Sequence, residues 1–186
     1  MVSAPAYALT VADIAEQTLS FTGFAQFNSA TGALTFTNPG TIPAGADGVF
    51  GPANTQITVG NLNLTSTGVN TWNLANPVDN WLTGLEDGLT FSLTSFDLTR
   101  VMLGGPLPPG SPSSFFVAGI QGVFQPLGLD GSGSFSAQGS LRIDGSSYSA
   151  DITAAPIPTP ALLPGLLGLG VAALRKRNGE EDAEQA

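Results

Sequence analysis

Alternation of apolar and polar residues with a period of two is the feature that most constrains how this chain can fold. From residue 134 to residue 143, every second side chain is aromatic, aliphatic or glycine, and the pattern resumes from 147 to 152. Side chains of a β-strand point alternately to its two faces, so each stretch predicts a strand with one buried face. Asp144-Gly145 between them suits the positive φ angles of a tight turn. The two stretches therefore predict an antiparallel hairpin.

The same alternation covers much of the remaining chain. Residues 19–27 alternate, and the pattern returns after a polar turn at 28–32, which predicts a second hairpin. The apolar positions change phase at Gly60 and again near Ser95, and each change predicts a β-bulge. The apolar run 115–120 predicts a more deeply buried strand.

Roughly nine or ten short strands separated by glycine, proline and asparagine predict a mostly β domain. We expect an antiparallel β-sandwich or jelly-roll, with an open barrel as the alternative. Helix is expected over one or two turns at Thr10–Gln17 and Asp79–Glu86, and in the apolar segment near the C-terminus.

Charge and composition exclude several classes of function. Residues 1–156 carry two arginines and ten acidic residues, a net charge of −8. Their surface repels phosphate backbones, so nucleic-acid binding is not expected. The chain has no histidine and no cysteine, which excludes catalysis and metal sites that need imidazole or thiolate groups. We therefore expect a noncatalytic domain without a cofactor.

A proline-rich signal, an apolar run and a basic cluster follow one another near the C-terminus. Residues 157–161 read Ile-Pro-Thr-Pro-Ala, residues 161–174 are almost purely apolar, and Arg175, Lys176 and Arg177 end the run. The run is shorter than the roughly 20 residues of a typical membrane helix, but long basic side chains can reach the interface and let a short helix span. Because basic residues concentrate on the cytoplasmic side, we expect a transmembrane helix with the preceding domain outside the cytoplasm.

The order of Pro158, Thr159, Pro160 and Ala161, the Leu/Gly-rich run and the basic cluster resembles the PEP-CTERM sorting domain in its PTPA variant. Thr159 stands where the founding pattern has an acidic residue, which places the chain with the variant. The resemblance implies that an exosortase, a membrane-embedded transpeptidase of cyanobacterial and other Gram-negative-type envelopes, recognises these four residues and cuts near them. It also implies delivery to the cell envelope, and then to the surface or the extracellular matrix.

The chain is therefore expected to have four parts. Ala6 and Ala8 have the small-x-small spacing of a signal-peptidase site, which predicts that an export signal ends there. The expected parts are the remnant of the signal-peptide cleavage region (1–8), the exported β-domain (9–155), the sorting signal with its transmembrane helix (156–177) and an acidic disordered tail (178–186).

Two places in the β-domain could bind a ligand. The segment 130–134 spaces oxygen atoms between glycines as calcium loops do, with Asp130 and Ser132 as candidate ligands. The complete calcium loop with its distant glutamate is missing, and a plain turn before the next strand is the simpler interpretation. Trp81 lies in a polar stretch and could stack on a sugar ring if it were exposed.

Three functions remain open at this stage. The first, which we favour, is a noncatalytic exported protein of the cell surface or extracellular matrix. The second is a carbohydrate-binding module for exopolysaccharide that uses Trp81, with or without calcium. The third is a carboxylate-based hydrolase with Glu86 and Asp87, although adjacent residues of a strand point to opposite faces and do not form a natural catalytic pair.

Overall fold

The computed structural model describes residues 9–44, 48–105, 114–137 and 146–157. The chain divides into two units, Met1–Pro156 and Ile157–Ala186, and all described secondary structure belongs to the first. The predicted C-terminal helix and the predicted turn at Asp144-Gly145 lie outside the described residues.

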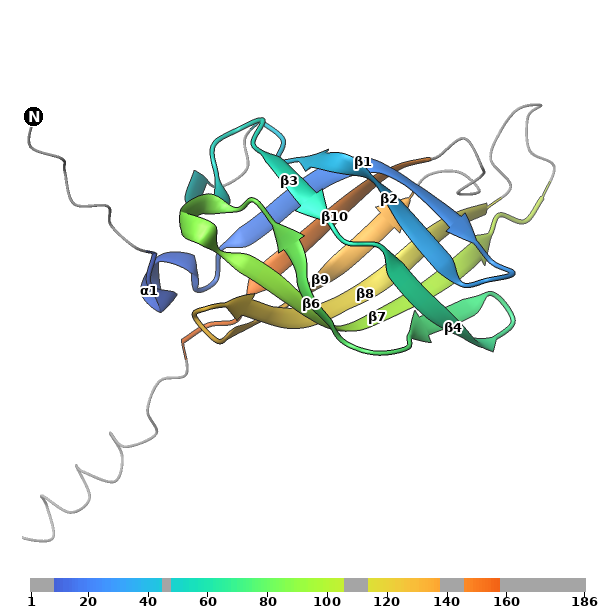
Figure 1. Cartoon of the computed structure of the whole chain (residues 1–186). Coiled ribbons are helices and arrows are strands. Elements are labelled where there is room, and N and C mark those ends of the chain that lie inside the picture. The colour runs from blue at the N-terminus through green and yellow to red at the C-terminus, as the bar shows by residue number, and fades with distance from the viewer. Residues whose placement is uncertain (1–8, 45–47, 106–113, 138–145, 158–186) are drawn as a thin grey trace, which may run out of the picture. The chain divides into compact units, whose positions relative to one another are not determined.

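The described part is mostly β, as predicted (Figure 1). It contains one short α-helix and two single 3-10 turns beside ten strands. In chain order the elements are α1 (Val11–Ile14), β1 (Thr18–Asn28), β2 (Ala33–Thr41), η1 (Gly48–Phe50), β3 (Gln56–Val59), β4 (Leu62–Gly68), β5 (Thr71–Leu74), β6 (Val78–Thr83), η2 (Glu86–Gly88), β7 (Thr90–Met102), β8 (Ser114–Gln125), β9 (Leu129–Ala137) and β10 (Ser146–Ala154).

The strands form one continuous antiparallel sheet that closes on itself. Its order is β1-β10-β9-β8-β7-β5-β4-β2, and β2 pairs again with β1, so the ring has eight strands. The expected sandwich of two separate sheets, and with it the jelly-roll, is therefore wrong. Alternation along a strand shows only that one face is buried, and a barrel buries its inner face as a sandwich does.

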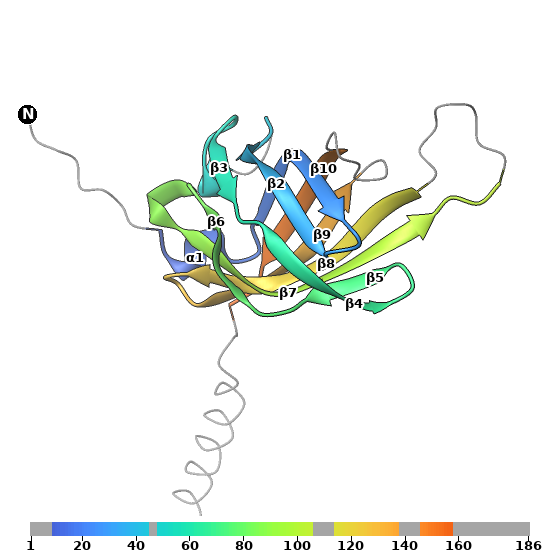
Figure 2. The same cartoon turned by 45° about the vertical axis from the view of Figure 1, so that its right-hand side comes forward.

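One side of the barrel is built from two short strand pairs placed end to end. The second half of β7 pairs with β5, whereas its first half pairs with β6. In the same way, β2 pairs with β4 near its start and with β3 near its end. Figure 2 shows β3 and β6 above one half of the barrel and β4 and β5 at the other. Between β2 and β7 the wall is therefore continued by β4 and β5 at one end of the barrel and by β3 and β6 at the other.

Most local predictions are confirmed. β9 and β10 pair antiparallel with Tyr148 opposite Ala137, and β1 and β2 form the second predicted hairpin. The register of β7 against β8 shifts between Leu93 and Ser95, where the phase change predicts a bulge. At Gly60, by contrast, no bulge forms within one strand: β3 ends at Val59 and β4 begins at Leu62.

The helix predicted at Asp79–Glu86 is wrong, because Val78–Thr83 is strand β6. Asn80 has a φ of 51°, and the register of β6 against β7 shifts around it. This kink makes the adjacent residues Trp81 and Leu82 both buried, which breaks the alternation that marks the other strands.

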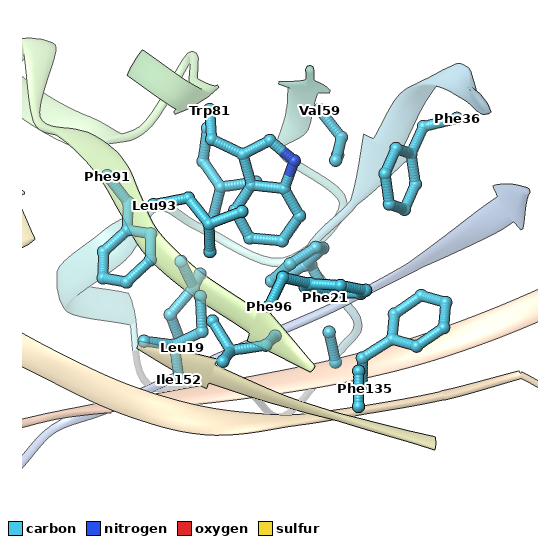
Figure 3. Close-up of a cluster of buried hydrophobic side chains, with 14 of the residues drawn as sticks. Leu19, Phe21, Phe36, Val59, Trp81, Phe91, Leu93, Phe96, Phe135 and Ile152 are labelled. Carbon is cyan, nitrogen blue, oxygen red and sulfur yellow. The ribbon is translucent and has the colours of Figure 1, made fainter. Parts of the chain in front are cut away.

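Aromatic side chains fill the interior of the barrel (Figure 3). Trp81 lies at the centre of one group, with ring centroids 6.1 Å from Phe21, 5.9 Å from Phe36 and 6.2 Å from Phe96, all edge-to-face. Phe135 continues the group, 5.6 Å from Phe96. An eight-stranded barrel is just wide enough for side chains to fill it, and edge-to-face pairs add to the stability gained by burial.

Two glycines allow the Phe91 ring to lie directly against the barrel wall. Gly122 of β8 is paired with Gly131 of β9. A Cβ atom on Gly122 would overlap the Ser92 carbonyl oxygen and the Phe91 ring, and one on Gly131 would lie 2.9 Å from that ring. These glycines are needed for close approach and are not turn residues.

Gly122→Ala is expected to destabilise the barrel by about 1–3 kcal/mol, because the methyl group overpacks a filled core. Gly119→Ala on the same strand is the matched control, since its Cβ would meet no atom within 4 Å. The control should lie within about 0.5 kcal/mol of the wild type. Urea denaturation measures both, and equal stability of the two variants would contradict this packing.

Tyr148 carries a buried hydroxyl group without a partner. The residue is buried, its ring stacks on Phe135 at 5.3 Å, and its hydroxyl finds no hydrogen bond within the described part of the chain. The hydroxyl points at Gly23 and Gly40, where a Cβ atom would lie 2.8 Å and 3.2 Å from it. Burial raises the pKa of the Tyr148 hydroxyl well above its usual range.

Tyr148→Phe is expected to keep or increase stability at neutral pH, because an unpartnered buried hydroxyl costs about 1–3 kcal/mol. The pKa of this group is higher in the folded state than the value of about 10 in the unfolded chain. Because the folded protein holds this proton more tightly than the unfolded chain does, the free energy of unfolding is constant below pH 10 in this respect and falls as the pH rises further. The variant should lack this alkaline loss, which chemical denaturation between pH 8 and 11.5 can measure. A clearly destabilised variant at pH 7 would show that the hydroxyl has a partner.

Candidate functional site

The predicted sorting signal cannot be placed in the structure. Pro158, Thr159, Pro160 and Ala161, and the basic cluster Arg175–Arg177, lie outside the described residues. Among the residues that are described, no helix has the length and apolar character needed to cross a membrane.

Trp81 cannot serve as a sugar-stacking platform, because it is only 1% exposed. Its indole N–H donates to the Gly60 carbonyl oxygen at 2.8 Å, and the Gly60 N–H donates back to the Trp81 carbonyl oxygen at 2.7 Å. The polar residues that precede it misled the prediction: Asp79 and Asn80 are exposed, and the kink at Asn80 turns the indole inward. The carbohydrate-binding hypothesis thus loses the residue that carried it.

Asp130 and Ser132 lie in strand β9 and not in a loop. Both side chains are exposed on the outer face, since they are two residues apart on a regular strand. The turn that precedes this strand contains Gly128, which has a φ of 66° and whose N–H donates to the Phe124 carbonyl oxygen at 2.9 Å. Neither the predicted calcium loop nor the predicted turn is therefore present at 130–134.

Asp130 and Ser132 do line a shallow depression on the outer wall, with a volume of about 340 Å³. It crosses three strands at the bulge of β7, where Ser95 pairs with Gln121 and Gln121 pairs with Ser132. Its lining residues are Thr94, Gln121, Gly122, Val123, Asp130, Gly131, Ser132 and Ala155.

The depression suits neutral hydrogen-bonding groups better than a cation. Asp130 is its one carboxylate, and the described residues contain no group of three acidic side chains close enough to hold a metal ion. Hard cations such as Ca²⁺ need six or more oxygen ligands, usually with several carboxylates. Glu86 and Asp87, the pair considered for hydrolysis, are exposed in η2 and do not line this depression.

Rows of hydroxyl groups cover the outer wall around β1, β9 and β10. The Thr18 and Thr153 hydroxyls lie 2.9 Å apart, those of Ser136 and Ser149 lie 3.1 Å apart, and Ser20 donates to the Asp151 carboxylate at 2.5 Å. Cross-strand pairs of this kind stabilise a sheet and leave a hydrogen-bonding surface on which Asp151 is the charged member of the three pairs named. The alternation along each strand predicts a polar outer face, whereas the hydroxyl pairs depend on which strands are neighbours, which no single strand encodes.

Comparison with known protein families, with curated proteins and with solved structures gives no match for this chain.

Calcium is expected to leave the stability of the protein unchanged, because the depression offers one carboxylate. Millimolar Ca²⁺ should shift the melting temperature by less than about 1 °C, both in the wild type and in Asp130→Asn. Differential scanning fluorimetry with and without a chelator measures this. A shift of several degrees that Asp130→Asn abolishes would restore the calcium hypothesis.

Proposed function

We propose that this chain is a noncatalytic exported protein of the cell surface or extracellular matrix, sorted by its C-terminal segment and processed by an exosortase-type enzyme. The observation that carries the proposal is the order of Pro158–Ala161, the apolar run and Arg175–Arg177. Each part has a physical role in that order: a recognition site, a short membrane span and a basic stop on the cytoplasmic side.

The described domain supports this proposal through its surface. Outward-facing serine and threonine side chains pair with each other, and the described part contains eight acidic residues and one arginine. Such a surface is well hydrated and repels other copies of itself, which favours solubility outside the cell.

The interior of the barrel also fits a structural role. Its aromatic side chains pack against each other, and the depression described on the outer wall is shallow and holds one carboxylate. Glycoside hydrolysis needs two carboxyl groups on opposite sides of the bond that is cut. No observation favours the hydrolase hypothesis, and the carbohydrate-binding hypothesis requires another contact than Trp81.

Mass spectrometry of the protein from the native cell envelope and medium tests the proposal. We expect a mature chain that ends near Pro160, with the peptides of the apolar run and of Arg175–Arg177 recovered only from the precursor in the membrane fraction. Replacement of both Pro158 and Pro160 by alanine should leave the full-length precursor in the membrane, because the recognition segment is altered while the span is kept.

The matched control replaces Pro156 by alanine, which changes a proline just before the signal and should leave processing intact. A mature protein that retains the segment through Arg177 would contradict sorting with cleavage. Recovery of the unprocessed protein in the soluble cytoplasmic fraction would contradict the membrane span itself.

A further inference from the structure

Arg100 occupies an unusual electrostatic position in the barrel. It is the one basic residue of the described part, and no carboxylate lies within ion-pairing distance of it there. It lies near the end of β7, at the barrel end opposite α1. Five of the described acidic residues lie at or near the α1 end: Asp13, Glu16, Glu86, Asp87 and Asp130.

Three contacts hold the Arg100 side chain and its strand in place. Its Nε donates to the hydroxyl oxygen of Ser114 at 3.1 Å, and Ser114 is fully buried. Its guanidinium carbon lies 5.9 Å from the centroid of the Phe116 ring, a cation–π distance. Its backbone N–H donates to the Asn70 carbonyl oxygen at 2.8 Å. The two terminal nitrogens of the guanidinium make no hydrogen bond within the described residues, so in that part of the chain four of its donors are unpaired.

The Phe116 ring that contacts the guanidinium belongs to an aromatic cluster with Phe27 and Trp72. The ring centroids lie 4.9 Å apart for Phe27 and Trp72, 5.6 Å for Phe27 and Phe116, and 6.3 Å for Trp72 and Phe116. Phe27 is partly exposed. Val69 and Met102, which flank Asn70 and Arg100 along the chain, are 91% and 56% exposed. A ligand at this end would therefore meet a charged fork beside apolar side chains.

From these contacts we propose that Arg100 binds the carboxylate of a uronic acid residue in an acidic glycan. A planar carboxylate matches the free edge of the guanidinium with two parallel hydrogen bonds. The net charge of −8 opposes the binding of any anion, and it opposes a singly charged carboxylate less than a doubly charged phosphate. The carbon-bound hydrogens of a sugar ring can then pack on the partly exposed Phe27 ring and the neighbouring apolar side chains.

This inference rests on the proposed function, since an acidic glycan is a partner that the protein would meet at the cell surface. It gives the carbohydrate-binding hypothesis a different site from Trp81. Ser114 acts as a positioning residue: its hydroxyl accepts from Nε and so turns the terminal nitrogens toward the ligand.

The test follows the two indole N–H resonances by NMR while trigalacturonate is added to the full chain. We expect the Trp72 resonance to shift, because Trp72 belongs to the aromatic cluster. The Trp81 resonance should not change, because its N–H donates to the Gly60 carbonyl oxygen inside the barrel. Maltotriose, a neutral trisaccharide with the same type of linkage, should shift neither resonance.

Variants then assign the contact. Arg100→Gln should weaken trigalacturonate binding about tenfold or more, as expected for a lost charge-assisted hydrogen-bond pair. Arg100→Lys keeps the charge but loses the fork and should lie in between. Ser114→Ala should weaken binding without changing the charge. An unshifted Trp81 resonance shows that each variant is folded.

Three outcomes would overturn the proposal: no shift of Trp72 with millimolar trigalacturonate, equal binding of maltotriose, or unchanged affinity in Arg100→Gln. Tighter binding of an acetylated glutamate peptide than of trigalacturonate would assign the site to a peptide carboxylate instead. None of these results alters the mature C-terminus found by mass spectrometry, so failure of this site and failure of the sorting proposal are distinguishable.

Discussion

The pairing of β1 with β2 is the contact on which the rest of the structure depends, because it turns a sheet into a ring. Once these strands meet, every wall strand has hydrogen-bonding neighbours on both sides. The enclosed space must then be filled to native density, and the aromatic side chains around Trp81 do so. The same constraint explains the glycines at 122 and 131, where a filled interior leaves no room for a side chain on the wall.

Local patterns in the sequence predicted strands well and their closure poorly. The bulge of β7 and the hairpin of β9 and β10 follow from alternation, which is a property of neighbouring residues. The hairpin of β1 and β2 is predicted locally, but it closes the ring only because β1 also pairs with β10, far away in the chain, and that contact has no signature in either strand. The strand β6 was mistaken for a helical turn because Asn80, at positive φ, disrupts its alternation.

The candidate sites also depend on contacts between residues that are distant in sequence. The sequence around Trp81 predicts exposure and the sequence around Asp130 predicts a loop or turn, yet Trp81 is buried behind a kink and Asp130 lies in strand β9. Arg100 has no motif around it in the sequence that marks a binding site. The proposed site is formed by Ser114 and Phe116, fourteen and sixteen residues away, which the pairing of β7 with β8 brings to the Arg100 guanidinium.

The separation of charge along the barrel has a consequence for encounter as well as for binding. Among the described residues, five of the eight acidic residues lie near α1 and Arg100 lies near the far end of β7, so the charges described are distributed unevenly along the barrel. In dilute salt a long-chain polyanion is therefore repelled more strongly by the α1 end than by the end with Arg100, and approach at the Arg100 end is favoured before any contact is made. This electrostatic preference acts over about a Debye length, so it weakens as the ionic strength rises. A polyanion would then approach the domain mainly at the Arg100 end in dilute salt and from all directions in concentrated salt.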